Sequence, residues 1–288
     1  MRSEYFISVD GGGTQCRTRL TDKQGQVLAS LNGGAANIYS DFTGAMIRAT
    51  QLINDTLQQA GLPASARRQT VAVLGLAGAN VQSVRQQAQQ WPQDFAHWQV
   101  LSDVEIACLG AHRGQPGAVL ITGTGSQGAF WDGSQFRCVG GWGLTLSDQG
   151  SGALLGKRAL RLALQAHEGL VPSSPLLQAL MAHFDHSPEL LLRWATDATP
   201  AHWGQFSPQI FDYAGQQDPH GTALIDITAQ EISLMVNHLT ENGQHCVALM
   251  GGLAAAVHRW LAPAVQRQVV PAAGDALTGG LQLAFTWG

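Results

Sequence analysis

The sequence predicts an α/β protein of two similar domains that face a shared cleft. Three strands in a row, separated by a Gly-Thr turn and a polar turn, open the chain between residues 5 and 31. The same order returns at residues 118–139, where GTGS forms the first turn and Asp-Gly-Ser the second. Apolar helical periodicity and short strand-like runs follow each trio, which is typical of alternating α/β chains. The order of the elements is therefore duplicated.

Each half has elements with clear boundaries. In the first half, apolar residues recur at helical spacing from Phe42 to Leu57, and the helix is expected to end at Gly61. After residue 150 helical patterns dominate until a strand-like run at 245–252. The expected strands are 5–9, 15–20, 26–31, 70–78, 98–103, 118–122, 127–131 and 135–139, and the glutamine-rich stretch 83–93 is expected to be a helix that ends near Pro92.

The boundary between the domains is expected near residue 115. Residues 1–115 would form the N-terminal domain and residues 116–273 the C-terminal domain. The segment 274–288 should return to the first domain as a helix. Hinges between the domains are expected near 113–117 and 271–275, because a domain pair that encloses its ligands must move about a few connecting segments.

Composition limits the partners of the chain. The formal charge of the 288 residues is −4, only 12% of residues are charged, and the basic residues are scattered apart from Arg67-Arg68. This pattern gives no surface for nucleic acid or anionic lipid. No apolar run approaches the roughly 20 residues of a membrane span, and the N-terminus lacks the pattern of a signal peptide. The four cysteines lie far apart, so a reducing cytoplasm is the expected compartment.

The two glycine turns are the first candidates for ligand binding. Glycines lack Cβ atoms, so backbone N–H groups in DGGGT (10–14) and GTGS (123–126) could approach phosphate oxygens. Thr14 and Thr124 add hydroxyl donors. Neither turn ends in the GK[ST] of a P-loop, so phosphates would lie between two hairpins. A lone GGGT is equally explained as a hairpin turn, and the repetition at matching places is what favours phosphate binding.

A third glycine motif stands where a strand gives way to a helix. MGGLAAAV (250–257) places Gly251 and Gly252 at this point, where an adenosine could rest on bare backbone. Close packing of a helix on a sheet explains the same two glycines.

Taken together, these motifs resemble those of the actin, sugar-kinase and heat-shock-ATPase superfamily. DGGGT, SD at 102–103, GTGS and MGG are similar to its phosphate-one, catalytic, phosphate-two and adenosine motifs. Within it the chain resembles the N-acetylglucosamine kinase and BadF-BadG type ATPase branch, most closely the bacterial glucosamine kinases. The likeness covers nearly the whole chain and implies two actin-like, ribonuclease H-like domains. The cysteine clusters that hold zinc or an iron-sulfur cluster in related branches are absent.

The resemblance implies ATP and Mg²⁺ as cofactors and assigns the residues that bind them. Asp10 would hold Mg²⁺, which prefers oxygen ligands and retains waters, although a plain turn aspartate is the alternative. Ser207 matches a position that contacts adenine, and its alternative is an N-cap ahead of Pro208. The nucleotide residues implied are Asp10, Gly11, Gly12, Gly13, Thr14, Gly123, Thr124, Gly125, Ser207, Gly251 and Gly252.

Asp103 is the candidate general base. Phosphoryl transfer to a sugar hydroxyl needs a carboxylate that orients the hydroxyl and takes its proton. Asp103 follows the strand at 98–102, at the carboxyl end where ligands of open α/β sheets gather. Ser102 or Asp103 could instead cap the helix that begins there.

Sugar recognition is expected from residues with hydrogen-bonding side chains or exposed backbone. Asn37 could also cap the helix near Asp41, Asp148 could be a turn residue, and Trp142 could belong to the core. Gln127 could reach the sugar or the nucleotide. The substrate residues implied by the resemblance are Asn37, Asp103, Gln127, Trp142, Gly143 and Asp148.

The sequence therefore predicts ATP-dependent phosphorylation of the 6-hydroxyl of an amino sugar. D-glucosamine is the first candidate and N-acetylglucosamine the second. A sugar sensor or an ATPase that drives a partner protein is the alternative from another class. The expected partners are the small-molecule sugar and ATP, without nucleic acid or membrane, and a homodimer is compatible with the sequence.

Overall fold

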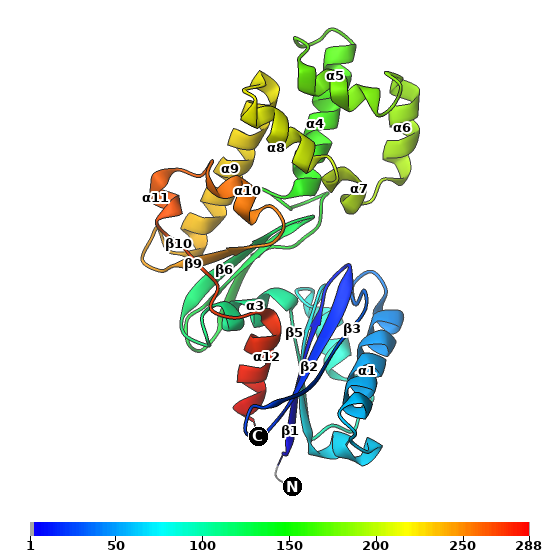
Figure 1. The fold of residues 1–288 in the computed structure, drawn as a ribbon, viewed down its shortest axis with the longest axis vertical. Helices are drawn as coiled ribbons and strands as arrows, with labels where there is room; N and C mark the ends of the chain where they lie inside the picture. Colours follow the sequence, from blue (N-terminus) through cyan, green and yellow to red (C-terminus); the bar gives the residue numbers. More distant parts are fainter. Residues whose placement is uncertain (1–2, 288) are drawn as a thin grey trace. The chain divides into compact units, whose positions relative to one another are not determined.

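The computed structural model describes residues 3–287, which form two compact units (Figure 1). Unit 1 contains the chain up to Val119, the segment Ala129–Arg137 and the chain from Pro271 on. Unit 2 contains Leu120–Gly128 and Cys138–Val270. The chain therefore passes from one unit to the other within strands as well as at residue 270.

Two five-stranded sheets with the same strand order form the framework. The orders are β3-β2-β1-β4-β5 and β8-β7-β6-β9-β10. In the first sheet β1, β2 and β3 are antiparallel, whereas β4 and β5 join β1 in parallel. The predicted α/β class and duplicated topology are confirmed. The strands are β1 (Tyr5–Gly11), β2 (Gln15–Asp22), β3 (Val27–Gly34), β4 (Thr70–Leu76), β5 (His97–Leu101), β6 (Gly117–Thr122), β7 (Ser126–Trp131), β8 (Phe136–Gly140), β9 (Val247–Met250) and β10 (Val269–Val270).

Helices cover both faces of the first sheet (Figure 1). Ile7 and Val9 of β1 point to the core that α1 closes, and the alternate residues Phe6 and Ser8 point to α12. β3 extends beyond the predicted residue 31, because Gly33 still pairs with Cys16 of β2. The helices of unit 1 are α1 (Phe42–Gln59), the 3₁₀ helix η1 (Ala64–Gln69), α2 (Gln82–Gln89), α3 (Asp103–Ala111) and α12 (Ala276–Phe285).

Helices α3 and α12 touch through glycines. A Cβ at Gly110 of α3 would lie 1.9 Å from the carbonyl oxygen of Asp275, and one at Gly279 would lie 2.0 Å from that of Ile106. Asp275 caps α12 and is bound by Arg19 of β2, with Nη2 2.7 Å from Oδ2. The start of α12 is therefore bound to the sheet through Arg19 and packs closely on α3, the helix that carries Asp103.

Unit 2 is mostly helical, as the sequence predicts. Three of its helices begin with a Ser or Thr cap followed by proline, at Ser174, Ser187 and Thr199, a combination that satisfies the free N–H groups of the first turn. None of the helices within residues 3–287 combines the length and apolarity needed to cross a membrane. The helices of unit 2 are α4 (Gly152–His167), α5 (Pro175–Ala182), α6 (Pro188–Asp197), α7 (Pro200–Gly204), α8 (Ser207–Gly215), α9 (Pro219–Leu239), α10 (Ala254–His258) and α11 (Pro263–Gln266).

Candidate functional site

The first glycine hairpin joins β1 to β2 in unit 1. The N–H of Gly12 donates to the carbonyl of Gln15 at 2.9 Å and closes the turn. Gly11 is needed for packing, because a Cβ there would lie 2.6 Å from Leu76. A Cβ at Gly13, in contrast, would meet no atom within 4 Å. Gly13 and the exposed Thr14 thus leave backbone and hydroxyl groups open to a ligand, whereas the N–H and the carbonyl of Gly12 are both bonded within the protein.

Asp10 stands at the end of β1, beside this hairpin. Its Oδ2 accepts a hydrogen bond from Arg17, its cross-strand partner in β2. The carboxylate side chain is 15% exposed, and no bond to its Oδ1 occurs among residues 3–287. The ion pair was not predicted, although Asp10 and Arg17 lie opposite each other in a hairpin whose turn the sequence shows.

Asp103 is the first residue of α3, and it does not cap the helix. Ser102 is the cap: its N–H and its hydroxyl donate to Glu105 Oε2 at 2.7 and 2.8 Å, and its Oγ accepts from the N–H of Glu105. Arg85 of α2 holds Glu105 in turn, with Nη2 3.0 Å from Oε2. Among residues 3–287 the Asp103 carboxylate is bonded to backbone N–H groups only, and that of Val104 lies 3.0 Å from Oδ1. Its second oxygen is available to a substrate.

The environment of Asp103 alters its acidity. Burial, and secondly the negative charge of Asp10, raise the pKa of Asp103 to about 6. The bond from Val104 opposes this rise but does not cancel it. A carboxyl group with such a pKa is ionised at neutral pH and is a stronger base than an exposed aspartate.

Asn37 lies in the connection between β3 and α1. Its Oδ1 accepts hydrogen bonds from the N–H groups of Tyr39 and Ser40 at 2.9 and 3.2 Å, which is an Asx turn. The alternative that Asn37 caps α1 is wrong, because Asp41 accepts the capping bond from Gly44. The Nδ2 of Asn37 has no partner among residues 3–287, so it can donate to a ligand.

The second glycine hairpin joins β6 to β7 and rests on the start of α4. The N–H of Gly123 donates to the carbonyl of Gly125 at 2.9 Å and closes the turn. The N–H groups of Gly152 and Ala153 donate to the carbonyls of Gly123 and Thr124 at 2.8 and 3.2 Å. The first turn of α4 thereby fixes the backbone of the hairpin and leaves the hydroxyl of the exposed Thr124 accessible.

The MGG turn packs against this second hairpin. Gly251 has φ +96°, and a Cβ there would lie 2.3 Å from the carbonyl oxygen of Thr122. The N–H of Leu253 donates to the same carbonyl at 3.1 Å. A Cβ at Gly252 would meet no atom within 4 Å. The structure therefore brings the predicted phosphate-two and adenosine motifs together, with Gly251 serving the packing and Gly252 the open surface.

Ser207 contacts the first turn of α4, on which the second hairpin rests. It is buried, and its hydroxyl donates to the carbonyl of Gly152 at 3.0 Å, 55 residues away. The alternative that Ser207 caps α8 is wrong, since Phe206 occupies the N-cap position. In this structure Ser207 holds the first turn of α4.

Asp148 links the loop of residues 140–150 to the second hairpin. Its Oδ1 accepts from the N–H of Ser126 at 3.4 Å, and a Cβ at Gly125 would lie 3.3 Å from both carboxylate oxygens. The side chain is buried, and burial raises the pKa of Asp148. No arginine, lysine or histidine within residues 3–287 forms an ion pair with it. A buried carboxylate without a cation favours a cationic ligand.

Trp142, Gly143 and Gln127 lie in and beside this loop. Trp142 is 59% exposed, so the alternative that it belongs to the core is wrong. Gly143 has φ +81° and open space around its α-carbon. The Nε2 of Gln127 is buried against Gly141 and has no hydrogen-bond partner among the described residues.

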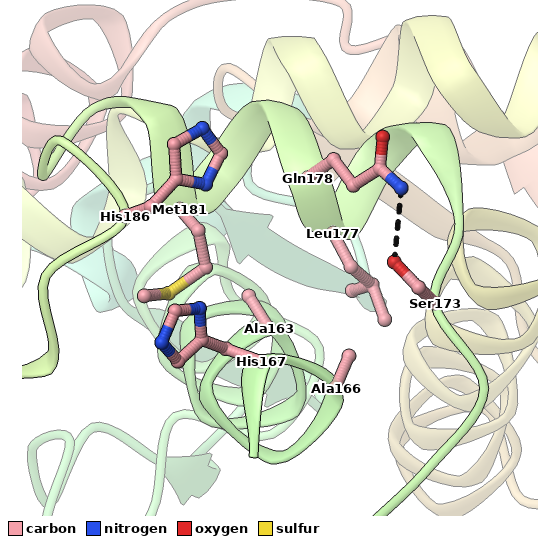
Figure 2. Close-up of a pocket in the computed structure, with 8 residues that line it drawn as sticks. All are labelled: Ala163, Ala166, His167, Ser173, Leu177, Gln178, Met181 and His186. Atoms are coloured by element: carbon pink, nitrogen blue, oxygen red, sulfur yellow. Dashed lines mark hydrogen bonds between the residues drawn. The ribbon is translucent and has the colours of Figure 1, made fainter. Parts of the chain in front are cut away.

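A cavity of about 730 Å³ opens beside Trp142. Its lining includes Leu146, Ser147, Glu231 and Leu234. A smaller pocket between α4 and α5, of about 100 Å³, contains none of the predicted site residues (Figure 2). Gln178 and Ser173 close part of its rim with a 3.2 Å hydrogen bond. It has room for only a few water molecules.

The predicted site residues thus form two groups. Unit 1 carries the first hairpin, Asp10, Asn37 and Asp103, and unit 2 carries the second hairpin and all the others. The described residues contain no cluster of three or more His, Cys, Asp or Glu side chains that could hold a metal by themselves. A hard cation at Asp10 would therefore depend on water and on ligand oxygens.

Two units with one strand order and paired glycine hairpins define the actin-like class of two-domain α/β proteins. A ROK hexokinase from Thermus thermophilus has this fold, with a TM-score of 0.58 at 14% identity over 98% of both chains. A protein from Chromobacterium violaceum, provisionally named an N-acetylglucosamine kinase, matches with a TM-score of 0.89 at 32% identity over 98% of this chain and 99% of that one.

The sequence comparison gives the family. The chain belongs to the BadF/BadG/BcrA/BcrD ATPase family, whose model matches residues 7–279. It is also 36% identical over 280 residues to the glucosamine kinase GspK of Vibrio cholerae, covering 97% of this chain and 95% of the relative.

Proposed function

We propose that this chain transfers the γ-phosphoryl group of ATP to the 6-hydroxyl of D-glucosamine. The family and the full-length relatives support an ATP-dependent hexosamine kinase. The observation that favours glucosamine over N-acetylglucosamine is the likeness to a glucosamine kinase along nearly the whole chain. The buried carboxylate of Asp148 agrees with this choice, because the ammonium group of glucosamine would supply the cation that it lacks.

In this proposal the two hairpins bind the nucleotide. Backbone N–H groups of Gly13 and Gly125, with the hydroxyls of Thr14 and Thr124, donate to phosphate oxygens, while the N–H of Gly12 closes the first turn. Gly252 leaves room for the adenosine, while Gly11 and Gly251 allow close packing next to the hairpins. The N–H of Gly123 closes the second turn. Ser207 supports the nucleotide side through Gly152.

Asp10 fits Mg²⁺ as a partner through water. Its free Oδ1 can accept from a metal-bound water while Oδ2 stays with Arg17. One or two carboxylates are the usual protein contribution for Mg²⁺ bound with a nucleotide, which supplies further oxygens. When bound, the ion neutralises charge on the phosphate oxygens.

Asp103 acts on the acceptor. Its free carboxylate oxygen accepts a hydrogen bond from the sugar 6-hydroxyl and takes the proton as the oxygen bonds to the γ-phosphorus, while the bond to the ADP oxygen breaks. Asn37 Nδ2 donates to a sugar hydroxyl. Trp142, Gly143 and Gln127 border the sugar, and Asp148 pairs with the 2-ammonium group.

A coupled ADP-release assay with MgATP tests the proposal. The panel is glucosamine, N-acetylglucosamine, glucose and no sugar. Glucosamine should give the highest kcat/KM, with one sugar phosphate formed per ADP. A preference for N-acetylglucosamine would replace the substrate only, whereas equal ADP release without sugar would favour a partner-driving ATPase. Sugar binding without any ADP release would favour a sensor.

A further inference from the structure

Glu231 of α9 is tied to the loop of residues 140–150. Its Oε2 accepts a hydrogen bond from the backbone N–H of Gly150 at 2.9 Å, across 81 residues. Arg158 of α4 adds two bonds, from Nη1 to Oε2 at 2.8 Å and from Nη2 to Oε1 at 2.6 Å. The Glu231 side chain is only 18% exposed. These charge-assisted bonds in a shielded place are stronger than those of an exposed ion pair.

The loop needs support at this point, because its backbone is unusual. Asp148 has φ +63° and Gly150 has φ +75°. The left-handed region is uncommon for a non-glycine residue, although aspartate tolerates it better than most, and the contacts around the loop hold this conformation. At Gly150 a Cβ would lie 2.5 Å from Ile232, so the loop passes directly against α9.

Two further bonds join the loop to the second hairpin. The hydroxyl of Thr122 donates to the carbonyl of Gly150, and that of Ser126 donates to the carbonyl of Gln149, both at 2.6 Å. Glu231 therefore holds the amide side of Gly150 while Thr122 holds its carbonyl side. The hairpin has independent support from α4 and from Leu253, whereas the amide of Gly150 depends on Glu231.

We infer that Glu231 is a positioning residue for the acceptor site. Through the N–H of Gly150 it fixes the loop that carries Trp142, Gly143 and Asp148 in the conformation that binds the hexosamine. This inference rests on the proposed function. Glu231 acts through the loop and not on the reacting atoms, and nothing in its local sequence marks it for this role.

The variant Glu231→Gln tests the inference, because it keeps the size of the side chain and removes its charge. Hydrogen exchange should become faster in a peptide that covers residues 142–151. The kcat/KM for glucosamine should fall about tenfold, because Gln keeps one acceptor oxygen but replaces a hydrogen bond to a charged group by one to a neutral group. The KM for ATP should change less than about twofold. Glu189→Gln is the matched control, since Glu189 pairs with Arg193 on the exposed surface of α6.

Several results would overturn the inference. One is an unchanged exchange rate in the loop, and another is an unchanged kcat/KM for glucosamine. The third is a kinetic defect that is equally large for glucosamine and for ATP and that parallels a decrease in melting temperature, because this would indicate a general loss of stability. If Glu231→Gln does not fold, Arg158→Lys decides by the same measurements, because it weakens the support of Glu231 and keeps a positive charge. Hydrogen exchange needs no turnover, so a failure of the proposed function is distinguishable: the parent protein would then phosphorylate no hexosamine.

Discussion

Ser102 and Glu105 cap α3 together, with the Ser102 hydroxyl 2.8 Å from the Glu105 carboxylate. This pair relieves Asp103 of any capping role, although Asp103 is the next residue after the cap. An aspartate in this position would otherwise be explained by helix stability alone. The available oxygen of Asp103, and its pKa raised by burial and by Asp10, agree with the proposed role as a base.

Asp103→Asn should abolish most of the activity without harming the fold. We expect kcat to fall by at least about a hundredfold, as for loss of a general base. Because the cap is Ser102, and because a buried charge disappears, the melting temperature at pH 8 should equal or exceed that of the parent. Asp226→Asn, at an exposed position of α9, is the control. A folded Asp103→Asn variant with parental kcat would remove Asp103 from the mechanism.

The pH dependence follows from the same carboxyl group. The pKa of Asp103 is raised to about 6, so kcat/KM for the sugar should fall as the pH decreases through about 6, because the base becomes protonated. The raised pKa also means that the ionised form opposes folding above pH 6. The gain in melting temperature of Asp103→Asn should therefore be largest above pH 6 and should vanish below about pH 4. An acid limb near pH 4 would contradict this assignment.

Substitution by alanine should have different effects at Gly251 and Gly252 of the MGG turn. Gly252→Ala should fold normally and weaken MgATP binding, because its methyl group would occupy open space over which the nucleotide is proposed to lie. Gly251→Ala should melt at a lower temperature, because its Cβ would lie 2.3 Å from Thr122. Gly215→Ala, with only an ordinary contact at 3.8 Å, is the control. Calorimetric titration with a non-hydrolysable ATP analogue measures the binding, and unchanged affinity in Gly252→Ala would exclude Gly252 from the nucleotide site.

Asp148→Asn should change the choice of sugar. If Asp148 pairs with the ammonium group, the kcat/KM for glucosamine should fall about tenfold to a hundredfold, the usual effect of a lost bond to a charged group. The kcat/KM for N-acetylglucosamine should change much less. Equal losses for the two sugars would show that Asp148 does not recognise the 2-substituent.

The pair of Arg19 and Asp275 should stabilise unit 1 in a pH-dependent way. Burial alone would raise the pKa of Asp275, but hydrogen bonds from Arg19 and Thr278 outweigh it and lower the pKa to about 2. The pair therefore stabilises the fold above about pH 4, and this contribution is lost as the pH falls towards 2. Arg19→Met should lower the melting temperature at pH 7 by about 2–4 °C, corresponding to about 1 kcal/mol.

The difference from the parent should shrink as the pH decreases. Arg193→Met, which breaks an exposed pair, should have a smaller effect at every pH. An effect of Arg19→Met that is the same at pH 3 and pH 7 would contradict the ion-pair explanation.

The sequence allowed the element order, both glycine hairpins and the position of Asp103 to be predicted, because these depend on local patterns. The periodicity of α1 and the turn before β2 are examples. Contacts between distant residues could not be predicted: the Ser207 hydroxyl reaches Gly152 across 55 residues, and Glu231 reaches Gly150 across 81. No local rule selects such partners. The ion pair of Asp10 and Arg17 was within reach, since counting outwards from the hairpin turn places them opposite each other.

The glycine contact between α3 and α12 has a consequence for the order in which the protein is made. Because synthesis proceeds from the N-terminus, all of unit 2 is synthesised before residues 276–285 exist. Until then Gly110 of α3 has no Gly279 to pack against, and the face of β1 that carries Phe6 and Ser8 is uncovered. Unit 1 is begun first and completed last, so one face of its sheet stays uncovered until the end of translation.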